Sequence, residues 1–533
     1  FRWISFVSFS LVFVALSAFD CLPTALAIIF MLVFLSLMLT RDLVNLHIAE
    51  RPEVELKTDK IKLIKGSIQA RKSLFTIADV LITIWSIFLP LALHGTCLAF
   101  SNDAAEFGIV TTKFSFNTYM MRSWSKPDSC PPGPPCHFFA ILPEDSSSAV
   151  LLHVHTHNDI TAIQVGMSSS SQSQGHISDQ QVYKIRNIEK GGQRNIHIVL
   201  VDNLAPDTLY NFTVSYEGSI QANYTYLTMP TNTSSRNLTL AFGGDVGNNQ
   251  KHVQMSEFVG NSSPDAIVIG GDLSYDNNIK HCYYTWDGFL EPLERIAKQA
   301  GRLIPFIFSV GNHEVGLNDY ANRKTVIDEN GPLYFSWFAQ HTLGTSTNKT
   351  IPDQTQRTTY QYHLVADTVI FSLDTGYVEP MEGAQADFIA NISNQYIDKR
   401  KIAVYHKPMY SPCVKKDLNR TNMLIGKRAF LNAFDKYNFS LNIENHNHMF
   451  KRTKPIKYGE ENSKGTVYLG EGCWAVTPSE CADVNRGGLI EMRNNSLNNV
   501  WIVTLQSNQT TARAYNIMGE LVDQTVVQAI ISQ

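Results

Sequence analysis

Long apolar runs and one polar loop alternate over the first hundred residues. Residues 4–19 and 24–40 are nearly uncharged, and Asp20–Pro23 separates them. Residues 74–100 form a third apolar run that only Asp79, Pro90 and His94 interrupt. A membrane-spanning helix needs about 20 apolar residues, so the two short runs predict a tight transmembrane hairpin and the third run predicts another span.

The charge of the intervening loop predicts the orientation of this anchor. Residues 41–73 carry eight Lys/Arg against five Asp/Glu, which places the loop in the cytosol and the chain after residue 100 on the far side of the membrane. The alternative is that the first run is a cleaved signal peptide, which leaves that side unchanged. We expect residues 1–100 to be a membrane anchor of two or three helices with a basic loop, in which Asp79 either contacts a membrane partner or lies at the interface.

Short alternating segments follow the apolar region. Strand-like patterns rich in β-branched and aromatic residues occur at 150–157, 196–201, 210–216 and 224–229, with turn residues between them. This spacing predicts a fibronectin type III-like β-sandwich over residues 101–233. His153, His155 and His157 alternate on one side of a strand, which favours a polar strand face over a metal site because no second group of ligands lies nearby in the sequence.

A different pattern begins after residue 233, where apolar strands repeatedly end in a polar residue. The strands at 238–242, 266–269, 305–310, 369–373, 402–405 and 440–443 lead to Asp245, Asp272, Asn312, Asp374, His406 and His446. Segments 289–300 and 383–397 can supply intervening helices. In α/β sheets the ligands lie on loops beyond the strand ends, so the pattern predicts an α/β domain over residues 234–533 with a site at that edge.

Sequons and cysteines indicate an oxidising compartment. Eleven Asn-x-Ser/Thr sequons occur, none before residue 101, at Asn211, Asn223, Asn232, Asn237, Asn261, Asn348, Asn391, Asn419, Asn438, Asn494 and Asn508. Their distribution predicts a glycosylated extracellular or lumenal surface. Eight cysteines fit the same location, with Cys130–Cys136, Cys473–Cys481 and Cys282–Cys413 as candidate disulfides whose connectivity the sequence leaves open.

The candidate chemistry is that of hard metal ions. Carboxylates mixed with imidazoles, an amide and a phenol suit two adjacent hard or borderline cations rather than a thiolate zinc site. A shared carboxylate such as Asp272 can bridge two cations about 3.5–4 Å apart. The net charge of −4 offers no basic surface, so nucleic acid is not expected as a partner.

Five ordered blocks carry a family resemblance. They read Gly-Gly-Asp245-Val-Gly, Gly-Asp272-Leu-Ser-Tyr275, Gly-Asn312-His313-Glu314, Tyr405-His406-Lys-Pro and His446-Asn-His448. This set resembles the calcineurin-like metallophosphoesterase superfamily and specifically the purple acid phosphatases, with Tyr275 as the specific mark. Segments 204–210 and 226–230 are similar to the fibronectin-like domain of that family, so the resemblance covers residues 105–530.

The resemblance implies a fold, a reaction and a role for each site residue. The fold is an α/β sandwich with two central sheets, and the reaction is hydrolysis of phosphate monoesters by a metal-activated hydroxide, with acidic operation. The implied ligands are Asp245, Tyr275 and His448 for Fe³⁺, Asn312, His406 and His446 for Zn²⁺, Mn²⁺ or Fe²⁺, and Asp272 as the bridge. His313 would face the phosphate and either protonate the leaving group or stabilise charge.

The chain departs from the family pattern at two places. Asn445 stands where the family has glycine before the last His pair, and the family's additional histidines after His406 are replaced by the stretch 411–417. Lys415 and Lys416 in that stretch either bind phosphate as point charges or belong to a solvated loop.

These patterns together predict a membrane-anchored, glycosylated acid phosphatase. Its domain would lie outside the cell or in the lumen of a secretory or endomembrane compartment, and its substrate would be a phosphorylated small molecule or a phosphoprotein. The alternatives are a phosphodiesterase or nucleotide pyrophosphohydrolase with the same metal core, and a non-catalytic structural membrane glycoprotein. A membrane-protein partner or a homodimer remains open.

Overall fold

The computed structural model describes residues 130–169, 175–185, 194–276, 284–315, 333–345, 348–413, 425–470, 472–479 and 488–528. The predicted membrane anchor, residues 1–100, lies outside these ranges. None of the helices within the described ranges combines the length and the hydropathy that a membrane span needs.

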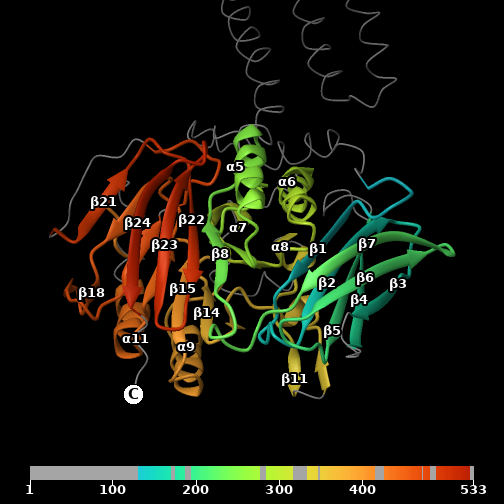
Figure 1. The fold of residues 1–533 in the computed structure, drawn as a ribbon, viewed down its shortest axis with the longest axis horizontal. Coiled ribbons are helices and arrows are strands. Elements are labelled where there is room, and N and C mark those ends of the chain that lie inside the picture. The colour runs from blue at the N-terminus through green and yellow to red at the C-terminus, as the bar shows by residue number, and fades with distance from the viewer. Residues whose placement is uncertain are drawn as a thin grey trace, which may run out of the picture. The chain divides into compact units, whose positions relative to one another are not determined.

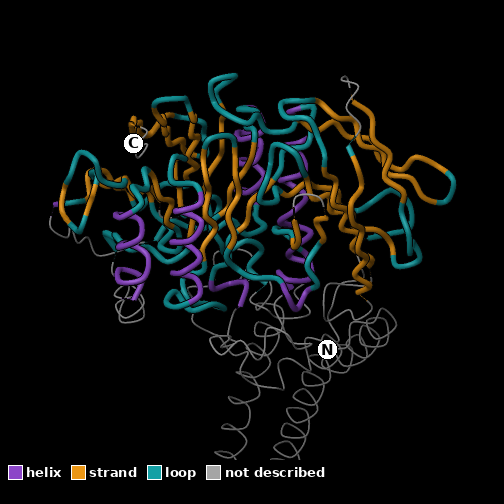
Figure 2. Tube along the Cα trace, turned by 90° about the horizontal axis from the view of Figure 1, so that it is seen from below, coloured by secondary structure: helices purple, strands orange, loops and turns teal. Residues whose placement is uncertain are grey.

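Two large sheets form the centre of the described chain. The first has ten strands in the order β24-β23-β22-β8-β9-β10-β1-β2-β5-β4, and the second has seven in the order β13-β14-β15-β16-β20-β17-β21. Strands outnumber helices in the described chain, and loops connect them over long stretches (Figure 2).

The first sheet is parallel at its middle, where three apolar strands lie side by side. These are β8 (Leu238–Gly243), β9 (Ala266–Ile269) and β10 (Phe306–Phe308). Antiparallel strands extend it on one side, namely β22 (Asn499–Leu505), β23 (Gln509–Asn516) and β24 (Leu521–Gln528). All side chains of β9 and β10 are buried, which is expected of parallel strands covered on both faces.

The second sheet has the same character. Its parallel strands are β14 (Thr368–Leu373), β15 (Arg400–Tyr405), β16 (Leu441–Glu444) and β20 (Val467–Gly470). Antiparallel neighbours at its two ends are β13 (Gln361–Val365), β17 (Phe450–Thr453) and β21 (Ile490–Asn494). Two small ribbons, β11 (Leu343–Thr345) with β12 (Asn348–Thr350) and β18 (Ile456–Lys457) with β19 (Glu460–Glu461), lie outside both sheets.

The two sheets pack on each other through an apolar layer, and helices cover their outer faces (Figure 1). Helices α5 (Gln250–Asn261) and α6 (Tyr284–Ala300) pack on the first sheet, and α9 (Ala384–Gln395) and α11 (Asn432–Lys436) pack on the second. Shorter helical segments are α7 (Asn312–Val315), α8 (Leu333–Trp337), η5 (Gln354–Gln356) and η6 (Lys427–Leu431). The predicted α/β sandwich with two central sheets is confirmed.

The segment before residue 233 forms a second layered region. Strands β1 (His137–Ile141), β2 (Val150–His157), β5 (Arg194–Asp202) and β4 (His176–Ile185) face a three-stranded sheet of β3 (Gln164–Ser169), β6 (Leu209–Tyr216) and β7 (Ser219–Leu227). A common core that includes Val154, Val199 and Phe212 fills the space between them. Tyr210 Oη accepts a hydrogen bond from the backbone N–H of Ala205 at 2.7 Å, which ties the turn before β6 to its strand. The likeness to a fibronectin type III domain stays a prediction.

This region is not separated from the rest by a break in the sheet. β1 pairs in parallel with β10, with Ile141 opposite Phe306, and Leu142 N–H donates to Phe306 O at 3.1 Å. Strands β1, β2, β5 and β4 are therefore a continuation of the first large sheet.

Of the proposed disulfides, Cys130–Cys136 is confirmed, with the two Cα atoms 5.1 Å apart. Cys413 is also disulfide-bonded. Cys282 and Cys481 lie outside the described residues, so the pairs proposed for them stay predictions.

Candidate metal centre

The strand ends of both sheets meet at one place. Asp245 follows β8, Asp272 follows β9 and Asn312 follows β10, while His406 and His446 follow β15 and β16 of the second sheet. The structure brings these side chains together with Tyr275 and His448, so the seven residues predicted as ligands converge. Their assignment as ligands stays a prediction.

Backbone conformation at the site is unusual for residues with a Cβ. Five of these residues have a positive φ, namely Asp245 (56°), Asp272 (51°), Tyr275 (60°), His446 (81°) and His448 (53°). A left-handed residue other than glycine costs roughly 1–2 kcal/mol. Such strain persists only where the surrounding structure imposes it, and it is frequent at functional sites.

One group of side chains surrounds His406. Its Nε2 lies 3.0 Å from Asp272 Oδ2 and 3.2 Å from Asn312 Oδ1. His446 Nδ1 lies 3.2 Å from the same Nε2. Asp272, His406 and His446 therefore offer ligand atoms within 4.8 Å of one another, in the combination predicted for the divalent ion.

A second group surrounds His448. Its Nε2 lies 3.1 Å from Asp245 Oδ1 and 3.4 Å from Tyr275 Oη. Asp245, Asp272 and His448 also offer ligand atoms within 4.8 Å of one another. Asp272 belongs to both groups, which is the position a bridging carboxylate would take.

The carboxylate oxygens and imidazole nitrogens of the site are placed as ligands of cations would be. Asp245 Oδ1 and Asp272 Oδ2 are buried and accept no hydrogen bond. Their nearest partners are imidazole nitrogens whose rings contact a backbone carbonyl through the other nitrogen: His406 Nδ1 lies 2.9 Å from Gly270 O, and His448 Nδ1 lies 3.3 Å from Thr477 O. A ring that donates from Nδ1 can bind a cation through Nε2 once Nε2 has lost its proton, and the carboxylate oxygen opposite could bind the same cation.

The charges at the site shift the pKa values of its members in opposite directions. Burial would lower the pKa of His406, but the carboxylates of Asp272 and Asp245 raise it to about 9. Burial and the neighbouring His406 hold the pKa of His446 well below its ordinary value. Burial would raise the pKa of Asp272, and the nearby imidazoles of His406 and His313 outweigh burial and lower it. The site therefore favours an ionised carboxylate at its centre.

His313 lies at the rim of the site, as its predicted role requires. Its backbone N–H donates to Asp272 Oδ1 at 2.8 Å, and its Nε2 lies 3.8 Å from Asp272 Oδ2. The imidazole stacks at a tilt on Tyr275, with ring centroids 4.1 Å apart, and the side chain is 13% exposed. It is the predicted residue of the site that binds no metal, and both its contact with the phosphate and its role in proton transfer stay predictions.

Glu314 is a structural support that sequence reasoning did not single out, although it ends one of the quoted blocks. Its carboxylate accepts three backbone N–H bonds, from Asp272 at 2.9 Å, Leu273 at 2.7 Å and Gly311 at 2.6 Å. The glutamate therefore joins the turn after β9 to the turn after β10. It fixes Asp272 relative to Asn312 without contacting a predicted metal position.

Two further residues beside the site escaped sequence reasoning. Tyr377 Oη donates to Asn312 Oδ1 at 3.4 Å, and Lys407 Nζ lies 4.0 Å from the centroid of the Tyr377 ring. Lys407 stands in the Tyr405-His406-Lys-Pro block, so the signal was present. Lys415 and Lys416, the predicted phosphate-binding candidates, lie outside the described residues.

Asn445, which replaces the glycine of the family pattern, packs against the glycines of the two Gly-Gly-Asp blocks. Asn445 Nδ2 donates to Tyr405 O at 2.8 Å, and the amide occupies the space that a Cβ at Gly244 or Gly270 would fill. The asparagine thus connects the turns after β8 and β9 with the end of β15. These two glycines are required by close packing rather than by backbone conformation.

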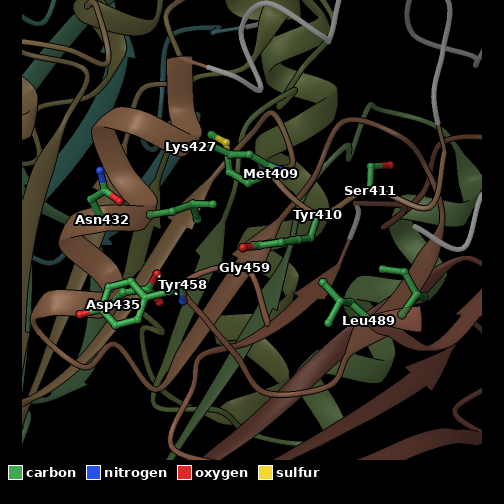
Figure 3. A pocket seen from close by; sticks show the side chains of 11 residues that line it. Met409, Tyr410, Ser411, Lys427, Asn432, Asp435, Tyr458, Gly459 and Leu489 are labelled. Carbon is green, nitrogen blue, oxygen red and sulfur yellow. Dashed lines mark hydrogen bonds between the residues drawn. The ribbon is translucent and has the colours of Figure 1, made fainter. Parts of the chain in front are cut away.

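A cavity of about 330 Å³ lies beside the loop that follows His406. Met409, Tyr410 and Ser411 line it together with Lys427, Asp435 and Tyr458 (Figure 3). Ser411 Oγ accepts a hydrogen bond from Asn447 Nδ2 at 2.7 Å, and Asn447 stands between two predicted ligands. None of the seven predicted ligands lines the cavity.

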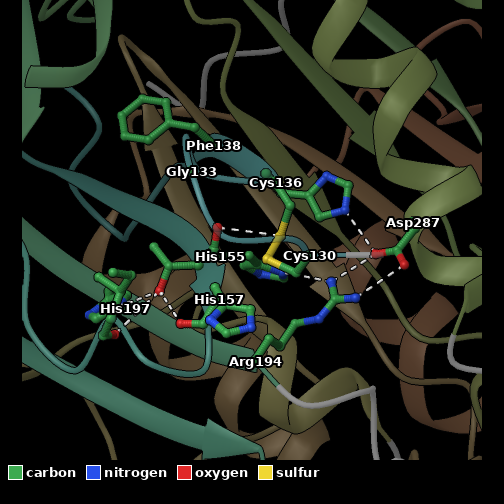
Figure 4. The surroundings of a disulfide bond; sticks show 12 residues. Cys130, Gly133, Cys136, Phe138, His155, His157, Arg194, His197 and Asp287 are labelled. Carbon is green, nitrogen blue, oxygen red and sulfur yellow. Dashed lines mark hydrogen bonds and ion pairs between the residues drawn. A yellow bond between two sulfur atoms is a disulfide. The ribbon is translucent and has the colours of Figure 1, made fainter. Parts of the chain in front are cut away.

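The alternating histidines of β2 do not form the polar surface that their pattern predicted. His153 and His155 are fully buried, against Phe139 and Trp337, because this face of β2 packs on the core rather than on solvent. Figure 4 shows His155 near the part-buried ion pair of Arg194 and Asp287, whose closest atoms are 2.7 Å apart. Among the described residues, no group of potential metal ligands includes these histidines.

Comparisons with known proteins agree with the geometry. Residues 239–450 match the family model of the calcineurin-like phosphoesterases. The fold is similar to that of the purple acid phosphatase PPD1 from seeds of yellow lupin (Lupinus luteus), with a TM-score of 0.58, 14% sequence identity and 74% of each chain covered.

More distant structural matches include PhoD and GAP50, the anchor in the inner membrane complex of Plasmodium. PhoD gives a TM-score of 0.49 at 12% identity over 75% of this chain and 94% of its own. GAP50 gives 0.37 at 12% identity over 56% of this chain and 90% of its own. No curated protein sequence matches the chain. By the family model, residues 239–450 therefore belong to a calcineurin-like metallophosphoesterase domain, and the described fold is similar to that of a purple acid phosphatase.

Proposed function

We propose that this protein hydrolyses phosphate monoesters at a binuclear metal centre. Family membership of the domain supports metal-dependent phosphoester hydrolysis. The observation that carries the finer proposal is the position of Asp272, whose carboxylate belongs to two groups of ligand atoms and keeps one buried oxygen without a hydrogen bond. A single cation would need only one of those groups.

The residues divide between two metal positions. Asp245, Tyr275 and His448 would hold Fe³⁺, because a phenolate is a preferred ligand of a hard trivalent ion. Asn312, His406 and His446 would hold Zn²⁺, Mn²⁺ or Fe²⁺, with Asp272 shared. When bound, two such cations supply an activated water at low pH and neutralise charge on the phosphate.

The chain itself supplies the remaining functions. Glu314 and Asn445 fix the relative positions of the turns that carry Asp272, Asp245 and His406. His313 sits beside the shared carboxylate, with Nε2 3.8 Å from Asp272 Oδ2, where it could hold or deliver a proton to the leaving group.

We further propose that the domain faces the extracellular space or a lumen, anchored by residues 1–100. Support comes from the sequons, because several of their asparagines are exposed, namely Asn223, Asn232, Asn237, Asn261, Asn391 and Asn508. Exposed asparagines can accept glycans without disturbing the core.

Metal analysis and visible absorption of the full-length protein test the central proposal. We expect two metal ions per chain, a purple phenolate-to-iron absorption band that Tyr275→Phe abolishes, and turnover of p-nitrophenyl phosphate with an acidic optimum. Two metals without turnover of either p-nitrophenyl phosphate or its bis-ester would favour a structural glycoprotein. Faster hydrolysis of the bis-ester would favour a phosphodiesterase, and an absence of bound metal would refute the proposal.

A further inference from the structure

The ring of Tyr377 connects Lys407 to the candidate metal centre. Lys407 directly follows His406, and its backbone N–H donates to Thr375 Oγ1 at 3.1 Å. Its ammonium lies 4.0 Å from the centroid of the Tyr377 ring, and the hydroxyl of that ring contacts Asn312 Oδ1 at 3.4 Å. The same ring stands edge-on to His406, with centroids 5.7 Å apart. The ammonium is therefore on the Asn312–His406 side of the site.

The charge of Lys407 has no direct counter-ion. Within the described part of the chain, Nζ forms neither an ion pair nor a hydrogen bond, although the side chain is largely buried. The carboxylates of Asp374 and Asp272 attract it from beyond ion-pair distance. Asp374 is already engaged, since it accepts bonds from Thr359 Oγ1 at 2.7 Å and from three backbone N–H groups.

The contact with an aromatic face does not fully offset the free energy that a partly buried ammonium loses on leaving water. Cation–π attraction offsets part of the desolvation cost, but a charged group away from water normally acquires an anion. Here the neighbouring anions are either saturated or shared with the predicted metal positions. Nζ can therefore still accept an anionic partner, and it lies over the ring whose hydroxyl contacts Asn312.

We propose that Lys407 binds a non-bridging oxygen of the substrate phosphate and thereby selects the dianionic group of a monoester over the monoanionic group of a diester. This inference rests on the proposed function. Lysine is a compact point charge with three donors, so it responds to the charge of the phosphate more than to its geometry. His313 stacks on Tyr275 of the His448 group, whereas Lys407 contacts Tyr377 beside Asn312, so the two residues would contact the phosphate beside different residues of the site.

The competing explanation is that Lys407 only holds the Tyr377 ring over Asn312. Three substitutions separate these roles. Lys407→Met keeps the apolar stem on the ring and removes the charge, whereas Lys407→Arg keeps a cation over the ring. Tyr377→Phe keeps the aromatic face and removes the hydroxyl contact to Asn312.

The test compares substrates and a product on the metal-loaded, full-length protein. For Lys407→Met we expect kcat/KM for p-nitrophenyl phosphate to fall about tenfold or more, which is the loss of one modest charge contact, while kcat/KM for bis(p-nitrophenyl) phosphate changes less than about threefold. The Kd of orthophosphate, measured by calorimetry, should rise about tenfold as well. Lys407→Arg and Tyr377→Phe should retain most of the preference for the monoester.

Lys436→Met is the matched control. Lys436 makes the same kind of contact on α11, with Nζ 5.0 Å from the Tyr437 ring centroid, so its loss should alter neither the substrate preference nor phosphate affinity.

Three results would overturn the inference: a parallel loss for both substrates, an unchanged Kd for orthophosphate, or a loss of bound metal in Lys407→Met. If no variant, nor the unmodified protein, hydrolyses either ester while orthophosphate binding still depends on Lys407, then the proposed function fails and the anion site stands.

Discussion

At the scale of single residues, the site depends on groups that hold a strained backbone in place. Asp245 and Asp272 both have left-handed φ values, and their turns are separate in sequence. Glu314 compensates by accepting three N–H groups from the turns around Asp272 and Gly311. The strain is thus balanced by a buried acceptor rather than by glycine.

Glu314→Gln tests this support. A glutamine amide has one oxygen and would turn its NH₂ toward a buried N–H donor, so we expect the free energy of unfolding to fall by about 1–3 kcal/mol. We expect metal affinity to weaken by roughly 10–100-fold, as for other groups that orient ligands from behind. Urea unfolding of the metal-free protein and competitive metal titration measure the two effects.

Glu291→Gln provides the comparison for that measurement. Glu291 is 63% exposed on α6 and pairs with Arg295 in the next turn, so its substitution should change neither quantity. Equal effects of the two substitutions would contradict the supporting role of Glu314.

At the scale of elements, a buried polar network joins strand β1 to helix α6. His137 on β1 contacts Asp287 Oδ1 at 2.8 Å through Nε2 and Glu294 Oε2 at 3.1 Å through Nδ1. Because both ring nitrogens face carboxylates, both carry protons. Arg194 of β5 completes the network through its ion pair with Asp287. Helix α6 is therefore held to the strands before residue 233 by charge as well as by apolar packing.

This network predicts a pH-dependent contribution to stability. Burial would lower the pKa of His137, but Glu294 and Asp287 raise it to about 9 from the ordinary 6.5. A pKa raised on folding means that the charged form stabilises the fold below about pH 6.5 and that this contribution is lost as the pH rises through about 9. The shift corresponds to roughly 3 kcal/mol at most.

His137→Gln should therefore lower the free energy of unfolding at pH 6 and do so much less at pH 10. Parallel urea titrations of the variant and the unmodified protein at several pH values check this difference. His176→Gln serves as the reference, since His176 is 66% exposed and lies 3.4 Å from Asp202. A penalty for His137→Gln that is constant with pH would exclude the charged histidine.

At the scale of the whole molecule, the described residues form one body. They all fall within a compact unit that spans residues 126–533. One core contains side chains from both sides of the predicted boundary at 233, such as Phe139 and Ile198 with Ile267 and Phe306. With β1 paired to β10, the two regions share both a sheet and a core.

Shared structure of this kind predicts a single cooperative transition. Phe139 is 1% exposed and stacks on His153, so Phe139→Ala should lower the free energy of unfolding by about 3–5 kcal/mol. Hydrogen exchange with mass spectrometry should show peptides of β2 and β8 losing protection at the same, lowered denaturant concentration.

The exposed Leu209, 45% accessible on β6, offers a control whose truncation should shift neither peptide. Loss of protection in β2 well before β8 would mean that the two regions unfold as separate units.

The local pattern of the sequence determined the strands of the phosphoesterase domain and the seven predicted ligands. Buried parallel strands are continuous apolar runs, and each ligand follows its strand within a few residues, so both signals are local. The predicted segments 150–157 and 289–300 correspond to β2 and to most of α6 for the same reason.

Only the tertiary structure decided how distant segments meet. It placed Asp272 in both ligand groups, set Lys407 over Tyr377, buried His153 and His155, and joined β1 to β10. Each of these contacts joins elements that are far apart in the sequence, through side-chain packing or strand pairing. Residue periodicity states which face of a strand is apolar, but not which element covers that face or which strand lies beside it.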